Sequence, residues 1–246
     1  MTERRVALVG NGSFYVGPEL CRHLAVRGHD LVVGDPDPTL VDELTAMGVA
    51  VEAVSGVADL ADPSSATRLV GAAMERFGRI DSAVAFSGVI VTGRFMNSSL
   101  DDLQSVTRSC LEAPYHFLKA VVAPMIEQRA GQVLVVTSAS GARPTPGAPL
   151  YSSVRAGANM MVANVAHEVA RHGIQVNAVG TNFMNFPEFL RASGAHDPAV
   201  RAKIEAQVPL GRLGTMVEFA SFCMPFIDGT SGFTTGQFVP YAGGWA

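Results

Sequence analysis

The stretch Val6-Ala-Leu-Val9-Gly10-Asn-Gly-Ser-Phe-Tyr15-Val-Gly17-Pro18 predicts a short strand that passes through a loop into a helix. Pro18 suits the first turn of a helix, and Gly28 suits the position just after the last turn. A second strand is predicted from Leu31 to Val33. The N-terminal part of the chain therefore predicts a strand, a helix and a second strand in that order.

The same alternation continues along the rest of the chain. Further strands are predicted at residues 49–54, 80–85, 133–136 and 176–179 and near Phe238, and further helices at residues 63–77, 100–128 (bent near Pro114) and 151–172 and near Glu218. Such alternation predicts an α/β, Rossmann-like, doubly wound and mostly parallel sheet with helices on both faces. Because no linker or internal repeat interrupts it, residues 1–246 are expected to form one domain.

The composition excludes several classes of protein. Of the 246 residues, 48% are hydrophobic and 16% charged, and the net charge of -4 gives no case for nucleic-acid binding. No apolar run is long enough to span a membrane, and the three cysteines have neither disulfide nor zinc spacing. His167 and His172 are five residues apart, about 140° around a helix, so they cannot share a metal. We expect a soluble, cytoplasmic protein without a metal site.

Several polar side chains follow predicted strands or begin helices, and we expect them to converge on one cleft at the carboxyl ends of the strands. They are Tyr15, Asp35, Ser87, Ser138, Tyr151 and Asn182. Tyr151 and Arg155 are four residues apart and so share one face of a helix.

A tyrosine with this neighbour suits proton transfer. A free phenol titrates near pH 10 (roughly), and a nearby cation favours the phenolate. Arginine stays protonated and supplies that charge without competing as a base. Tyr151 can then act as a general base while Ser138 binds the substrate oxygen. The alternative is that Tyr151 and Arg155 form an ordinary surface pair.

The spacing of Ser138, Tyr151 and position 155 resembles the catalytic signature of the short-chain dehydrogenases/reductases, and the likeness extends over nearly the whole chain. Four departures point to one branch. Tyr15 replaces the middle glycine of the first loop, and Arg155 replaces a lysine. Ala85-Phe-Ser-Gly88 replaces an Asn-Asn-Ala-Gly stretch, and Thr181-Asn-Phe-Met184 replaces a Pro-Gly pair. Together they resemble the halohydrin dehalogenases, whose pattern is Ser-x12-Tyr-x3-Arg with an aromatic residue in the first loop.

This resemblance implies an enzyme without a cofactor. It would convert vicinal haloalcohols to epoxides with release of halide and a proton, and open epoxides with azide, cyanide or nitrite in reverse. The catalytic residues would be Ser138, Tyr151 and Arg155, and the protein would be a homotetramer.

The resemblance places the halide where a nicotinamide would otherwise lie. It would be bound by Tyr15 and by the loop of Asn182, Phe183 and Met184, whose backbone N–H groups form an anion nest. Phe86, Phe186 and Phe189 are candidates to line a substrate pocket, although aromatic residues near a cleft belong equally often to the core.

An alternative is an NAD(P)-dependent reductase with an atypical Tyr-x-x-x-Arg site. In it, Asp35 and Asp59 would retain dinucleotide binding, and Tyr15 would be a core aromatic under a working loop. If the protein binds no dinucleotide, Asp35 and Asp59 are either a relic of a dinucleotide site or caps of helices. Cys110 occupies the place of an asparagine in the dehydrogenases and is expected to be a buried thiol. A third hypothesis is a non-catalytic scaffold.

Overall fold

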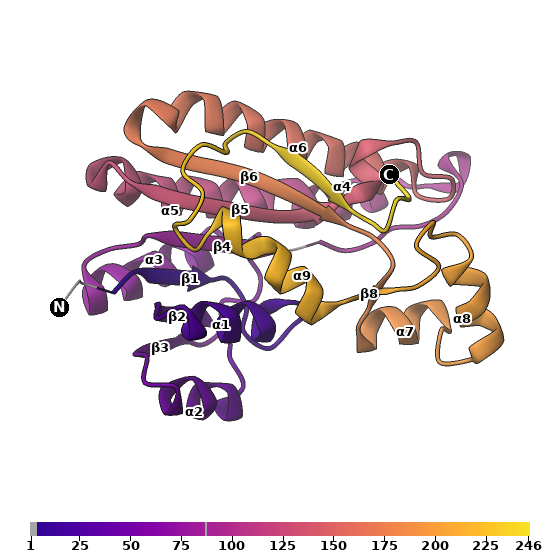
Figure 1. Cartoon of the computed structure of the whole chain (residues 1–246). Helices are drawn as coiled ribbons and strands as arrows, with labels where there is room; N and C mark the ends of the chain where they lie inside the picture. Colours follow the sequence, from indigo (N-terminus) through magenta and orange to yellow (C-terminus); the bar gives the residue numbers. More distant parts are fainter. Residues whose placement is uncertain (1–3, 87) are drawn as a thin grey trace.

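A seven-stranded sheet forms the centre of the computed structural model, which describes residues 4–86 and 88–246 (Figure 1). The strand order is β3-β2-β1-β4-β5-β6-β9, and every pair of neighbours is parallel. The strands are β1 (Val6–Val9), β2 (Asp30–Gly34), β3 (Val51–Val54), β4 (Ser82–Phe86), β5 (Gly131–Ser138), β6 (Ile174–Thr181) and β9 (Phe238–Tyr241). The strand order reverses between β1 and β4, so the predicted doubly wound fold is confirmed.

Helices cover both faces of this sheet and enclose two apolar cores. One core contains residues of α1 (Gly17–Val26), α2 (Pro38–Ala46) and α9 (Met216–Cys223), and the other contains residues of α3 (Pro63–Phe77), α5 (Ala113–Gln128) and α6 (Pro149–Val169). Strand β1 serves both cores, because successive side chains of a strand point to opposite faces. Leu8 lies in the second core, and Val9 lies in the first.

The helix predicted at residues 100–128 is interrupted. It consists of α4 (Leu100–Thr107), a π-helical turn η2 (Arg108–Glu112) and α5. The interruption comes just before Pro114, which has no backbone N–H to donate to the preceding turn. The predicted bend near Pro114 thus takes the form of a wider helical turn.

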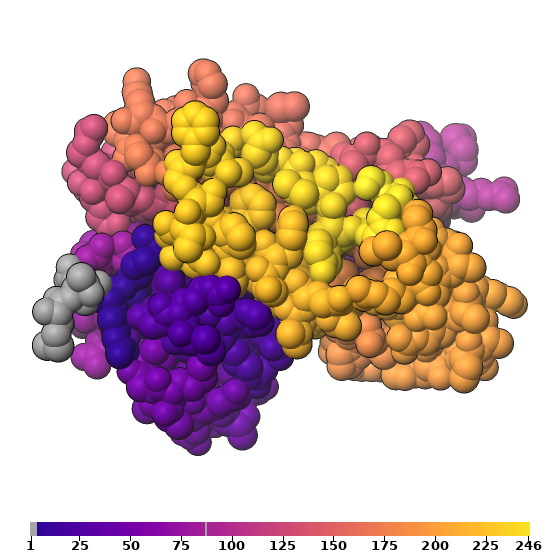
Figure 2. Space-filling model, in the orientation of Figure 1, coloured from indigo at the N-terminus to yellow at the C-terminus, as the bar shows by residue number. Residues whose placement is uncertain are grey.

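The sequence prediction missed three helices and one small sheet. The helices are α2, α7 (Pro187–Ser193) and α8 (Pro198–Glu205), and the sheet is a parallel pair, β7 (Met184–Asn185) with β8 (Gly214–Thr215). The short 3-10 turns are η1 (Phe95–Asn97), η3 (Ala139–Ala142), η4 (Ala170–His172) and η5 (Met224–Phe226). Figure 2 shows the orange segment that contains α7 and α8 as a protrusion beside the yellow C-terminal residues.

Within the described residues, no helix has the length and apolar character needed to cross a membrane.

Candidate active site

Tyr151 and Arg155 lie in the first half of α6 with their side chains buried. Tyr151 is 7% exposed and Arg155 is 4% exposed. The guanidinium carbon of Arg155 lies 5.2 Å from the centre of the Tyr151 ring. The alternative of a solvated surface pair is therefore wrong, because the structure places this cation and phenol in contact inside the protein.

Ser138 ends β5 and lies beside Thr181, the last residue of β6. Its hydroxyl donates a hydrogen bond to the Thr181 carbonyl at 3.3 Å and accepts one from the backbone N–H of Ser140 at 3.2 Å. The side chain is buried, at 5% exposure. Hydrogen bonds to the end of β6 and to Ser140 thus hold the hydroxyl of Ser138, the serine predicted to bind a substrate oxygen.

Tyr15 adopts a left-handed backbone conformation, with φ of 54°, in the loop between β1 and α1. Its hydroxyl donates to the Thr181 Oγ1 atom at 2.8 Å. Burial raises the pKa of Tyr15, and the hydrogen bond to Thr181 opposes that increase. The tyrosine of the first loop is therefore tied to the end of β6, which also binds Ser138.

Thr181 links these residues, through its carbonyl to Ser138 and through its hydroxyl to Tyr15. Thr181 was quoted above only as the first residue of the loop after β6 and was not predicted to be a site residue. The available signal was its place at the end of a strand, directly before the loop that departs from the dehydrogenase pattern.

Aromatic rings surround Tyr15. Its ring centre lies 4.7 Å from that of Phe186 and 6.0 Å from that of Phe86, and Phe186 lies 6.3 Å from Phe189. The three phenylalanines proposed for a substrate pocket are thus brought together beside Tyr15. Phe86 is nearly buried, at 8% exposure, so it also belongs to the core.

The loop between β1 and α1 uses its backbone donors internally. The N–H groups of Ser13 and Phe14 both donate to the side-chain oxygen of Asn11 at 3.0 Å. The N–H of Gly17 donates to the Phe14 carbonyl at 3.0 Å, and the next residue, Pro18, has no N–H. A helix N-terminus binds phosphate through exposed N–H groups. Ser13, Phe14, Gly17 and Pro18 therefore offer no N–H group to a ligand.

Asp35 and Asp59 are also engaged within the chain. The Asp35 carboxylate accepts from the backbone N–H groups of Gly56 at 2.5 Å and Val57 at 2.8 Å. Asp59 accepts from Arg108 Nη2 at 2.7 Å. Neither caps a helix, so the helix-capping interpretation is wrong: the cap of α3 is Asp62, which accepts from Ser64 N–H at 2.9 Å. That the two aspartates are a relic stays a prediction.

The loop after β6 has its own geometry. Phe183 has a left-handed backbone with φ of 55°, and its N–H donates to the Asn182 Oδ1 atom at 3.0 Å. Its carbonyl accepts from Gly214 N–H at 3.1 Å, and Met184 is buried at 3% exposure. The turn expected at Asn182 is present, and the amide of Asn182 itself occupies one of the two N–H groups proposed to face an anion.

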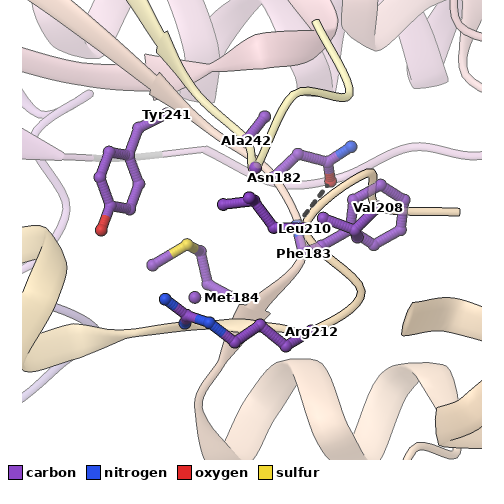
Figure 3. Close-up of a pocket in the computed structure, with 10 residues that line it drawn as sticks. Asn182, Phe183, Met184, Val208, Leu210, Arg212, Tyr241 and Ala242 are labelled. Atoms are coloured by element: carbon purple, nitrogen blue, oxygen red, sulfur yellow. Dashed lines mark hydrogen bonds between the residues drawn. The ribbon is translucent and has the colours of Figure 1, made fainter. Parts of the chain in front are cut away.

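A cavity of about 110 Å³ lies against this loop (Figure 3). Its lining comprises Asn182, Phe183, Met184, Val208, Leu210, Arg212, Gly214, Tyr241, Ala242 and Gly243. Arg212 is paired with Glu218 through two contacts of 2.6 and 2.9 Å, and this pairing lowers the pKa of Glu218 to about 2. None of the three proposed catalytic residues lines this cavity. Tyr15 thus lies with the catalytic group, whereas the other three proposed halide ligands also face a separate space. Ser87, expected in the cleft, lies outside the described residues.

Comparison with known proteins gives the family. The family model described as Enoyl-(Acyl carrier protein) reductase matches residues 16–246. A 2,5-dichloro-2,5-cyclohexadiene-1,4-diol dehydrogenase of Sphingobium indicum is 26% identical over 98% of this chain and 96% of its own length. A 3-oxoacyl-[acyl-carrier-protein] reductase of a Synechocystis species is 30% identical over 98% and 96%. A solved structure described as a dehalogenation enzyme superposes with a TM-score of 0.84 at 28% identity, over 99% of both chains. The chain belongs to the short-chain dehydrogenase/reductase family.

Proposed function

We propose that this member of the family is a halohydrin dehalogenase. The observation that carries the proposal is the position of Tyr15 across the crevice at the carboxyl ends of the strands. Its ring packs on Phe86 at the end of β4, and its hydroxyl bonds to Thr181 at the end of β6. Ligands of doubly wound sheets bind in that crevice, where the strand order reverses. An aromatic side chain in this place favours a small ligand over a dinucleotide.

The proposed reaction is an internal displacement. The Tyr151 phenolate takes the proton from the hydroxyl of a vicinal haloalcohol, whose oxygen is held by Ser138. The oxygen then forms a bond to the adjacent carbon as the carbon–halogen bond breaks, and the halide leaves with the bonding electrons. Because both reacting groups belong to one molecule, their effective concentration is high. The products are an epoxide, a halide ion and a proton.

Arg155 supports this step through its charge. Its guanidinium lies against the Tyr151 ring in a buried site, where a cation acts more strongly on a phenol than it does in water. Since arginine keeps its proton, it supplies a positive charge beside the base without taking part in the proton transfer.

The proposed halide site combines Tyr15 with the loop of Asn182, Phe183 and Met184. The Phe183 N–H donates to the Asn182 side chain in this structure. An anion that used this N–H would have to displace the amide oxygen of Asn182. Azide, cyanide or nitrite in the same place would attack an epoxide and reverse the reaction.

A second candidate is an NAD(P)-dependent oxidoreductase, and the names of the curated relatives favour it. The relatives reported above are a dehydrogenase and a reductase. The first loop and Asp35 offer a dinucleotide fewer partners, however. The N–H groups of Ser13, Phe14 and Gly17 donate within the loop, and the Asp35 carboxylate already accepts from Gly56 and Val57.

Ligand-dependent stability separates the two candidates. A ligand that binds only the folded state stabilises it by RT ln(1 + [L]/Kd) and so raises the melting temperature as its concentration increases. We expect bromide and azide to raise the melting temperature and NADH and NADPH to leave it unchanged. Stabilisation by either nucleotide at micromolar concentration would contradict the dehalogenase proposal and support the oxidoreductase.

A further inference from the structure

The backbone of Val89, just after β4, is held by two consecutive side chains of the π-helical turn η2. The Val89 N–H donates to Ser109 Oγ at 3.1 Å, and the Cys110 thiol contacts the Val89 carbonyl at 3.7 Å as a donor. The Ser109 hydroxyl donates in turn to the Ser105 carbonyl at 3.0 Å, so its lone pairs face Val89. Both polar groups of one backbone residue are therefore tied to the same helix.

The π-helical turn explains how neighbouring side chains reach the same segment. In an α-helix, successive side chains point about 100° apart. In η2, the N–H of Ala113 bonds to the carbonyl of Arg108, five residues earlier, which widens the turn. Such turns occur frequently at functional sites. Here the wider turn directs Ser109 and Cys110 to the segment that follows β4.

Gly88, directly before Val89, lies between this turn and Arg155. A Cβ atom at Gly88 would lie 2.0 Å from Arg155 Nη2 and 2.9 Å from Cys110 Sγ, and the backbone φ is 131°. The guanidinium and the thiol thus approach the same backbone atom, and only glycine leaves room for both. Cys110 and Tyr151 also share one buried apolar cluster.

We propose that Ser109 and Cys110 are positioning residues for Arg155. By holding both polar groups of Val89, they keep the backbone of Gly88 against the guanidinium, which in turn stays against the Tyr151 ring. Neither side chain takes part in the reaction. This inference rests on the proposed roles of Tyr151 as base and Arg155 as its cation. If the backbone of Val89 is released, the guanidinium gains freedom, and the phenolate loses part of its stabilisation.

The test uses Ser109→Ala and Cys110→Ala, with Ser153→Ala as the control. Ser153 is an exposed residue of α6, and its hydroxyl bonds only one turn back, to the Pro149 carbonyl at 2.8 Å. Two quantities are measured against pH in each variant: kcat/KM for 1,3-dichloro-2-propanol, and the phenolate absorbance near 295 nm. The absorbance is read as the difference from the same protein carrying Tyr151→Phe.

For Ser109→Ala and Cys110→Ala we expect kcat/KM at pH 7 to fall about tenfold and to approach the wild-type value at high pH. The Tyr151 phenolate should appear at higher pH in both variants and at the wild-type pH in Ser153→Ala. Cys110→Ser keeps a donor and should lose less activity than Cys110→Ala. A loss that is equal at every pH, or a phenolate titration that does not move in a folded variant, overturns the proposal.

The absorbance titration needs no substrate, so it separates this inference from the proposed function. If the wild type releases no halide but the titration moves in Ser109→Ala, the positioning role stands and the dehalogenase proposal fails. If the wild type releases halide and the titration stays fixed in both variants, the positioning role alone fails.

Discussion

Replacing Tyr15 with phenylalanine tests the link between the first loop and the end of β6. The change removes the hydroxyl that bonds to Thr181 at 2.8 Å and keeps the ring with its contacts to Phe86 and Phe186. A neutral hydrogen bond inside a protein contributes about 1 kcal/mol to stability, and more when its partner is left without a bond. For a chain of this size, a loss of about 1 kcal/mol lowers the melting temperature by about 2–4 °C.

The assay is urea denaturation of the wild type and two variants, Tyr15→Phe and Tyr115→Phe. Tyr115 is a matched control because it is 43% exposed and its hydroxyl contacts only the flexible amine of Lys119, at 3.4 Å. An exposed substitution of this kind changes the free energy of unfolding by less than about 0.5 kcal/mol. Equal stability of Tyr15→Phe and the wild type, or an equal loss in both variants, would refute the importance of the Tyr15–Thr181 bond.

Three further predictions concern the rest of the protein. Burial lowers the pKa of His29 below its value in the unfolded chain, about 6.5, so at pH values below 6.5 the unfolded state binds more protons and stability should fall. His29→Gln should flatten this decline in melting temperature between pH 7 and 5, and an unchanged slope would contradict the reasoning. Burial raises the pKa of Cys21 to about 12 and also raises that of Cys223, so Ellman's reagent should label neither thiol until the protein is denatured. Rapid labelling of either thiol in the native protein would contradict their burial. Asp81→Asn should cost about 2 kcal/mol, because the carboxylate accepts from the N–H of Val6 at 2.8 Å and from Arg79 at 2.7 Å, and asparagine loses the charge that Arg79 binds. A loss below about 1 kcal/mol in urea denaturation would show that the pair contributes little.

The elements predicted correctly are those whose signals are local. Strand β1 and helix α3 have the predicted bounds, because an apolar run marks the strand and Pro63 and Gly78 mark the ends of the helix. Helix α2 was missed although Asp37-Pro38 is a reasonable helix start, since only two of its residues are buried and the apolar pattern is weak. The π-helical turn also escaped prediction, because Pro114 indicates an interruption without specifying its form.

The candidate site was predictable where spacing along one helix decides the geometry. Tyr151 and Arg155 are four residues apart, so their contact follows from the helix alone. The bond between Tyr15 and Thr181 joins residues 166 positions apart, and no local pattern predicts it. The partners of Asp35 likewise come from a different loop, and they exclude only its helix-capping role. The single domain, the homotetramer and the identity of the halide ligands stay predictions.

Release of halide and proton from 1,3-dichloro-2-propanol without any nucleotide tests the central claim most directly. Halide is measured by ion chromatography and protons by pH-stat titration, for the wild type and for Tyr151→Phe. The proposed mechanism predicts one proton for each chloride from the wild type, and a loss of at least about 100-fold in Tyr151→Phe, since a positioned general base contributes that much. Full turnover by Tyr151→Phe, or no halide release by the folded wild type, would contradict it.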